Sequence, residues 1–206
     1  QSWAKASDAY GKALQLAPNA SDLRLKLGEL YYATDQFALA VRELEDFLRG
    51  EPTHVDALIL LGRTYTALKL PDKARDVLQR SCAMSKEACT NLRDLHIAEG
   101  RQLMSAKQFE EAVKAFDAAK GIHADETVYA WLLLGLNNLT RYEATVKLFD
   151  EARASGKTNA SVHNNAGIAL MELRRFDEAL KAFGEAIGLD PDFPLFQINK
   201  AILFTR

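Results

Sequence analysis

The sequence lacks the features that mark several large classes of protein. No stretch approaches the roughly 20 consecutive apolar residues that a transmembrane helix needs, and the longest apolar run extends only from Val128 to Leu134. Basic residues are not in excess, because 26 lysines and arginines stand against 28 aspartates and glutamates. A dedicated nucleic-acid-binding domain usually carries a basic stripe or a high pI. We therefore expect no direct membrane insertion and no nucleic-acid partner.

Residues that could carry catalysis or bind a metal are also sparse. The 4 histidines are far apart in sequence, and no two have the spacing of a metal-ligand pair. The glycines are dispersed rather than gathered into a phosphate-binding loop. Glu110-Glu111 and Asp177-Glu178 are interpreted as solvated carboxylates in the first turn of a helix, where the helix dipole favours them. The sequence therefore predicts no enzyme, no cofactor and no metal site.

Cysteine is limited to Cys82 and Cys89, seven residues apart, and two alternatives stay open for them. They are free thiols, which favours the cytoplasm, or they form a local disulfide, which favours an oxidising compartment such as the bacterial periplasm. The spacing permits a bridge if Cys82 ends one helix and Cys89 precedes the next. The chain opens with Gln1 rather than Met, so the missing signal peptide carries no information on compartment.

The sequence does contain an internal repeat. Residues of the same type recur 34 positions apart, as in the pairs Gly28 and Gly62, Tyr31 and Tyr65, Ala40 and Ala74, and Pro18 and Pro52. Apolar residues three and four positions from each glycine mark one face of a helix. An aromatic–alanine–aromatic series at the same spacing, as in Phe176, Ala179 and Phe183, marks a second helix. Each repeat is therefore predicted to be a pair of helices.

Glycine lies inside the first helix of each pair, although it costs about 1 kcal/mol there relative to alanine. The positions are Gly28, Gly62, Gly100, Gly135 and Gly167. A cost paid this often indicates a packing reason, which is the close approach of the partner helix. The small residues expected to face the glycines are Ala40, Ala74, Ala112 and Ala179.

This pattern resembles the tetratricopeptide repeat, whose 34-residue unit carries Trp-x-x-Leu-Gly-x-x-Tyr, then Ala-x-x-x-Phe, then Pro. The resemblance implies an all-α fold, an α-solenoid of antiparallel helix pairs stacked as a right-handed superhelix. It assigns a half repeat at residues 1–20, repeats at about 21–54, 55–92, 93–126, 127–159 and 160–193, and a half repeat at 194–206.

Two repeats depart from the regular length. Gly62 and Gly100 are 38 residues apart, which indicates an insertion near Ala88 to Leu92. Gly135 and Gly167 are only 32 residues apart, and Thr145 replaces the expected alanine. We expect the array to change pitch near residues 85–92 and 137–142.

The resemblance also implies a concave groove lined by the first helices, which binds a protein or peptide partner. The positions that line it lie two and three residues before each glycine and one residue after it, with Ala201 in place of the glycine in the last helix. The candidates chosen from these positions are Lys26, Glu29, Arg63, Arg101, Leu132, Leu133, Leu136, Asn164, Asn165, Ile168, Ile198 and Asn199. Asn165 and Asn199 are expected to bond the backbone of an extended partner, because an amide both donates and accepts. Alternatively, the leucines pack on neighbouring helices and form no trough. Leu25, Glu29 and Leu60 stand where a receptor for chaperone tails needs Lys and Asn, which excludes that specialisation.

The ends of the array carry exposed apolar side chains. Residues 194–206 make a poor polar cap, and Trp3 and Tyr10 face an absent helix. We expect a segment of a longer array, or association through the ends. The predicted function is a protein–protein interaction scaffold or adaptor in a multi-protein assembly. The alternatives are the substrate-selecting or targeting arm of a larger enzyme, and a scaffold of a bacterial secretion or polysaccharide-export machine.

Overall fold

The computed structural model describes residues 2–17 and 20–205, without the side chains of residues 2–4, and its regular structure there is entirely α-helical. The expectations for Trp3 and Pro18 lie outside this description. The helices are α1 (Ser2–Leu16), α2 (Ser21–Ala33), α3 (Phe37–Gly50), α4 (Val55–Ala67), α5 (Pro71–Cys82), α6 (Lys86–Ser105), α7 (Phe109–Ile122), α8 (Glu126–Asn138), α9 (Tyr142–Ala154), α10 (Ala160–Glu172), α11 (Phe176–Leu189) and α12 (Pro194–Leu203). None of the described helices is long and apolar enough to span a membrane.

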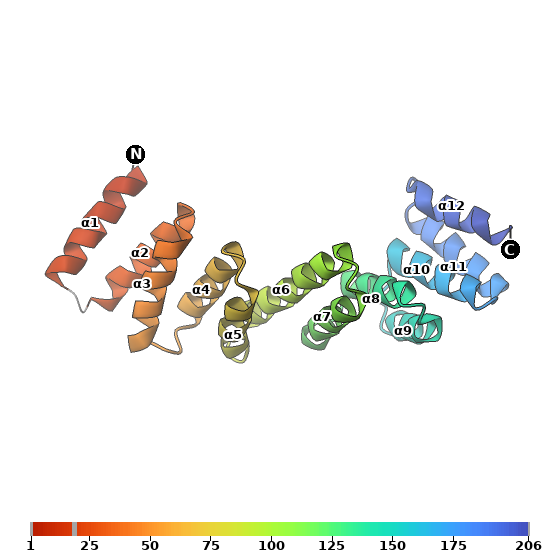
Figure 1. Ribbon diagram of the computed structural model, residues 1–206, viewed down its shortest axis with the longest axis horizontal. Coiled ribbons are helices and arrows are strands. Elements are labelled where there is room, and N and C mark those ends of the chain that lie inside the picture. The colour runs from red at the N-terminus through yellow and green to blue at the C-terminus, as the bar shows by residue number, and fades with distance from the viewer. Residues whose placement is uncertain (1, 18–19, 206) are drawn as a thin grey trace. The chain divides into compact units, whose positions relative to one another are not determined.

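The helices form two compact units, Gln1–Leu95 and His96–Arg206, and α6 begins in the first and ends in the second. In unit 1, α2 packs on α3 and α4 packs on α5, while α3 also contacts α4. In unit 2, α8 packs on α9 and α10 on α11, while α10 also contacts both α8 and α12 (Figure 1). This is the predicted all-α arrangement, in which antiparallel helix pairs stack in chain order within each unit.

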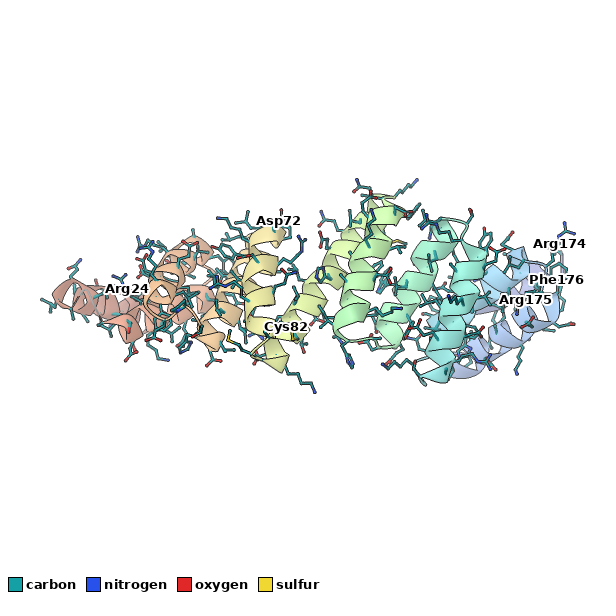
Figure 2. All side chains as sticks on the ribbon, turned by 90° about the horizontal axis from the view of Figure 1, so that it is seen from below. Arg24, Asp72, Cys82, Arg174, Arg175 and Phe176 are labelled. Atoms are coloured by element: carbon teal, nitrogen blue, oxygen red, sulfur yellow. A yellow bond between two sulfur atoms is a disulfide. The ribbon has the colours of Figure 1, made fainter. Side chains whose placement is uncertain are left out.

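The turn between the two helices of each pair has one recurrent geometry. The second residue after the first helix adopts a positive φ, as in Asp35, Lys69, Lys107, Thr140 and Arg174. The next residue then donates its backbone N–H to a carbonyl five residues earlier, as from Arg175 to Leu170 (2.9 Å) and from Arg141 to Leu136 (2.9 Å). This left-handed ending satisfies carbonyls that the last helical turn leaves free. Figure 2 labels one such turn at Arg174, Arg175 and Phe176.

These turns fix the register of each repeat and correct the one expected around Gly135. The residue with positive φ follows the repeat glycine by seven positions, as Arg174 follows Gly167. Seven positions before Thr140 stands Leu133, two residues ahead of Gly135. Leu133 is therefore the structural counterpart of the repeat glycine in α8. The predicted shortening of this repeat was wrong, because Leu133 and Gly167 are 34 residues apart.

The predicted close approach at the repeat glycines is confirmed. A Cβ added to Gly100 would lie 2.5 Å from the ring of Phe116, and one added to Gly62 would lie 2.6 Å from Leu78. The residue that meets the glycine is a large one, four positions after the alanine that was expected there. Gly135 differs, since its Cβ would lie 2.7 Å from Val113 of α7. Gly135 therefore allows α8 to pack closely on α7 of the preceding repeat.

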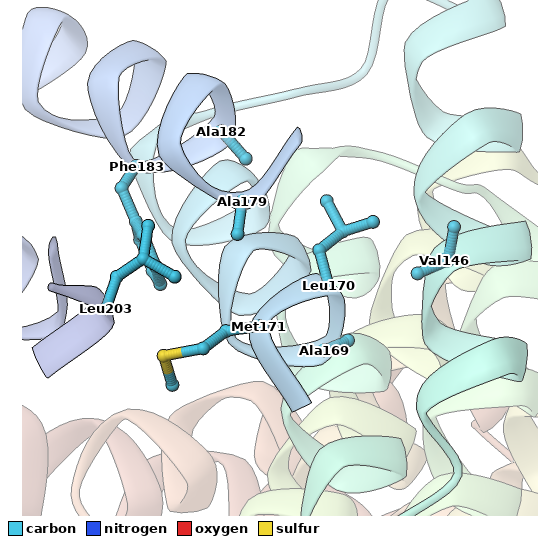
Figure 3. Packing of buried hydrophobic residues seen from close by; sticks show 8 residues of the cluster. All are labelled: Val146, Ala169, Leu170, Met171, Ala179, Ala182, Phe183 and Leu203. Carbon is cyan, nitrogen blue, oxygen red and sulfur yellow. The ribbon is translucent and has the colours of Figure 1, made fainter. Parts of the chain in front are cut away.

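The core of the last full pair illustrates the packing. Phe183 of α11 is fully buried and lies between α10 and α12, where it shares a cluster with Leu170 and Leu203 (Figure 3). Val146 of α9 joins the same cluster across the boundary between repeats. Each pair therefore buries its apolar face against its neighbours along the stack, as repeat proteins require.

Cys82 and Cys89 form a disulfide in the structure, with their Cα atoms 4.4 Å apart. Cys82 ends α5, at the opposite end of that helix from Asp72 (Figure 2), and Cys89 lies in the first turn of α6. The residues inserted between Gly62 and Gly100 lengthen the start of α6, which has 20 residues against 13 in α2 or α4. The bridge therefore joins the extension of α6 to the preceding helix.

Candidate binding groove

The corrected register relocates the candidate groove on α8. Counting from Leu133 instead of Gly135 gives Ala130, Trp131 and Leu134 as the candidate groove residues. All three line a hollow of about 410 Å³ on the face formed by the first helices α8, α10 and α12. The whole lining of this uncharged hollow is Thr127, Ala130, Trp131, Leu134, Asn159, Ser161, Asn164, Asn165, Phe193, Leu195 and Phe196.

Leu132 and Leu133, two predicted groove residues, are core residues instead. Their exposed fractions are 1% and 0%. Leu132 packs in the cluster around Phe116, and Leu133 packs with Phe149 in the next cluster. Leu136 is half-buried against the Phe116 cluster. The physical reason is rotation: at 3.6 residues per turn, an error of two residues turns the assignment by about 200°, to the opposite face of the helix.

No charged residue lines the uncharged hollow. Its apolar walls are partly open to solvent, since Phe193 is 46% exposed and Leu195 is 47% exposed. Phe193 and Phe196 lie together with ring centroids 4.8 Å apart. The remaining lining is made of amides and hydroxyls, so the hollow combines apolar contact area with hydrogen-bonding groups that carry no charge.

The asparagines around the hollow tie the first helices together. Asn165 of α10 donates from Nδ2 to the carbonyl of Ala130 in α8 (3.0 Å). Asn137 of α8 donates from Nδ2 to the carbonyl of Asn165 (2.8 Å), and Asn199 of α12 donates to Oδ1 of Asn164 (2.8 Å). The Nδ2 groups of Asn165 and Asn199, which were expected to reach a partner, are therefore engaged within the chain.

Two polar atoms in this lining remain available for a hydrogen bond to a ligand. Asn164 Nδ2 and Asn165 Oδ1 make no hydrogen bond within the described part of the chain, and neither belongs to the buried unsatisfied atoms found there. They are a donor and an acceptor, the pair that a peptide group requires. Their positions are set by the bonds to Ala130 and Asn199.

A second hollow, of about 340 Å³, lies between α6 and α8 and shares Trp131 with the first. We call it the Arg101 hollow, and its lining is Ala98, Arg101, Gln102, Met104, Ser105 and Trp131. The indole of Trp131 stacks on Phe116 with ring centroids 5.6 Å apart and an angle of 15°. The guanidinium of Arg101 lies 5.6 Å from the same indole, a cation–π arrangement.

The other predicted groove residues are not brought into either hollow. In unit 1, Lys26 pairs with Glu29 (2.7 Å), and Arg63 donates to Glu87 (2.9 Å) and Asn91 (3.1 Å). These exposed ion pairs between neighbours on the first helices contribute little stability. Ile168 is half-buried against the core. Ile198 is 53% exposed on α12, outside the lining of both hollows.

Sequence reasoning missed Thr127, Trp131 and Leu134 of α8, and it missed Phe193 and Phe196 at the start of α12. Counting back seven residues from the turn at Thr140 to Leu133 would have found Trp131 and Leu134, because the turn marks the register of this repeat and Gly135 does not. Among the described residues, no group of three or more His, Cys, Asp or Glu side chains could hold a metal ion. His163 is buried, and its Nδ1 lies 2.8 Å from the partly exposed carboxylate of Glu185.

Comparisons with known proteins agree with this architecture. Family models described as tetratricopeptide repeat match residues 25–88 and 160–193. No curated protein sequence matches the chain.

Solved structures with a similar fold include YrrB, MamA and a domain of Arabidopsis OM64. YrrB, a TPR protein with an unusual peptide-binding site, is 18% identical, with a TM-score of 0.59 over 95% of this chain and 99% of its own. MamA is 19% identical, with a TM-score of 0.55 over 83% of this chain and 92% of its own. The TPR domain of Arabidopsis OM64 is 21% identical, with a TM-score of 0.53 over 57% of this chain and 98% of its own. At these identities the likeness concerns the fold. The two family matches identify residues 25–88 and 160–193 as tetratricopeptide repeats, and the paired helices of both units have the fold of this repeat.

Proposed function

We propose that this chain is an interaction scaffold whose first-helix face in unit 2 binds an extended segment of a partner protein. Tetratricopeptide repeats in general serve as non-enzymatic scaffolds for protein–protein interaction. The observation that supports this site is the uncharged hollow, in which Phe193 and Leu195 stay about half exposed beside unengaged amide atoms. Concave apolar surface with a few convergent polar groups is the usual character of a binding site.

The asparagine network supports the choice of an extended segment. Asn164 Nδ2 and Asn165 Oδ1 offer one donor and one acceptor, which match the C=O and N–H of a peptide group whatever its side chain. Their bonds to Ala130 and Asn199 hold these amides in place before a ligand arrives. Such preorganisation reduces the entropy lost on binding.

The test is a groove-blocking variant, Thr127→Arg with Ser161→Arg. Both residues are exposed and line the uncharged hollow, so two long side chains fill it without entering the core. The matched control is Ala118→Arg with Ala144→Arg, two exposed positions on the second helices α7 and α9. Peptides are selected on the wild-type chain from a phage-displayed random library, and their affinities are measured by isothermal titration calorimetry.

The proposal predicts that selected peptides bind the wild type and the control variant equally and fail to bind the blocked variant. Equal binding to the blocked variant would remove the groove from this function. A library that yields no binder to the wild type would also count against an extended partner segment.

One observation favours a particular cellular compartment for this scaffold. The Cys82–Cys89 disulfide suits a protein of an oxidising compartment, such as an envelope assembly of a bacterium. Trapping thiols with an alkylating reagent in intact source cells, followed by mass spectrometry, tests it. Alkylated Cys82 and Cys89 would contradict this setting, and a peptide containing the intact bridge would support it.

A further inference from the structure

We infer that the partner segment carries a bulky apolar side chain beside a carboxylate, with Trp131 lying between the two contacts. The apolar side chain enters the uncharged hollow, and the carboxylate pairs with Arg101 on the other side of the indole. This inference rests on the proposed function and specifies its ligand. Three observations in unit 2 support it.

The first observation is the contrast in charge between the two hollows. The uncharged hollow is lined by no Asp, Glu, Lys or Arg. A charged side chain entering it would lose hydration without gaining an ion pair, which is unfavourable. An apolar side chain would instead bury the exposed faces of Phe193 and Leu195, and this contributes about 25 cal/mol of favourable free energy for each Å² of apolar surface removed from water.

The second observation is that Arg101 is the sole charge in the lining of its hollow and has no carboxylate partner among the described residues. Arg63 provides an internal comparison, because both arginines directly follow the repeat glycine of a first helix. Arg63 is satisfied by Glu87 and Asn91 of its own unit. Arg101 rests only on the face of Trp131. Its planar guanidinium therefore remains open for a carboxylate, which it can bind through two parallel hydrogen bonds.

The third observation is the position of Trp131. Its side chain lines both hollows, so a single segment that crosses it meets both sets of contacts. Stacking on the buried Phe116 holds the indole in one orientation. Tryptophan and arginine in a preorganised setting are the residue types that most often dominate the affinity of an interface.

The experiment uses the peptides that the phage-displayed library yields on the wild-type chain. The inference predicts that they are enriched in Asp or Glu near Phe, Trp, Leu, Ile or Met. A selected peptide is then synthesised with its acidic residue and with Lys in its place. Both peptides are titrated into the wild type, Arg101→Glu and the matched reversal Lys114→Glu, which changes an exposed residue of α7.

Arg101→Glu should weaken the acidic peptide by about tenfold or more, as loss of a charge-assisted pair implies, and should strengthen the Lys peptide. Lys114→Glu should leave both affinities unchanged. Selected peptides without acidic enrichment, or equal effects of the two reversals, would overturn the inference. If binding is then still abolished by Thr127→Arg with Ser161→Arg, the proposed function stands without it.

Discussion

The ring of Phe183 occupies the space in which Gly167 would carry a side chain. A Cβ built on Gly167 would lie 2.6 Å from Cε1 and 2.7 Å from Cδ1 of that ring. Gly100 and Phe116 have the same relationship. The two helices of these pairs can therefore approach only because the first helix has no side chain at one position.

Replacing Gly167 by alanine should destabilise unit 2. The added methyl group forces the buried Phe183 ring to move, an overpacking cost of about 1–3 kcal/mol, and this exceeds the gain of at most about 1 kcal/mol in helix propensity. Urea unfolding followed by circular dichroism measures the change. Gly184→Ala is the control, because nothing lies within 4 Å of a Cβ at Gly184 in the same pair of helices. A Gly167→Ala protein as stable as the control variant would contradict the packing described.

Leu133 and Leu134 should respond oppositely to truncation, although they are neighbours in sequence. Leu133→Ala leaves a cavity beside Phe149 and should cost about 2–5 kcal/mol of stability. Leu134→Ala removes part of the wall of the uncharged hollow, so it should weaken peptide binding more than stability. Unfolding curves and calorimetric titrations of both variants test the register. If Leu133→Ala instead weakened binding and Leu134→Ala lowered stability, the helix face predicted from Gly135 would be the correct one.

The stability of unit 2 should fall in mild acid because of His163. Burial lowers the pKa of this imidazole, Glu185 partly opposes the shift, and Arg153 adds to it. The other ring packed on His163 is Phe149, at 5.4 Å between centroids. The unfolded chain, with a histidine pKa near about 6.5, therefore binds a proton before the folded chain does. Stability is full above that pH and declines as the pH falls towards the lowered pKa.

The measurement for His163 is the free energy of unfolding between about pH 7.5 and about pH 5.5, the range in which histidine titrates. His163→Gln should show a smaller decline than the wild type. His123→Gln, at an exposed position, should follow the wild type. Parallel pH profiles for the wild type and His163→Gln would exclude the buried imidazole as the cause.

Reducing the Cys82–Cys89 disulfide should destabilise the protein by about 2 kcal/mol, because a loop this short restricts the unfolded chain only moderately. Unfolding is compared with and without a phosphine reductant. The variant Cys82→Ser with Cys89→Ser should resemble the reduced wild type and should not respond to the reductant. A reductant effect on that variant would show that another process is being measured.

Local sequence patterns were sufficient to predict the helices, their pairing and most of the repeat register. Apolar residues at three-and-four spacing select the buried face of a helix from local geometry alone. Gly28, Gly62, Gly100 and Gly167 also indicated the close approach correctly, because glycine inside a helix is costly unless a neighbour needs the space.

The buried face of α8, in contrast, could not be predicted from local patterns. Residues 132–136 are Leu-Leu-Leu-Gly-Leu, so the spacing of apolar residues favours no single face of the helix. Gly135 misleads as well, because it stands two residues after the position that corresponds to the repeat glycine. The turn at Thr140 and the packing of Leu133 on Phe149 set the register instead. Hydrogen bonding was equally undetermined, because Asn165 suits a partner's backbone as well as the carbonyl of Ala130, and only the distance between α8 and α10 chooses between them. The groove therefore depends on contacts between helices that local sequence patterns do not encode.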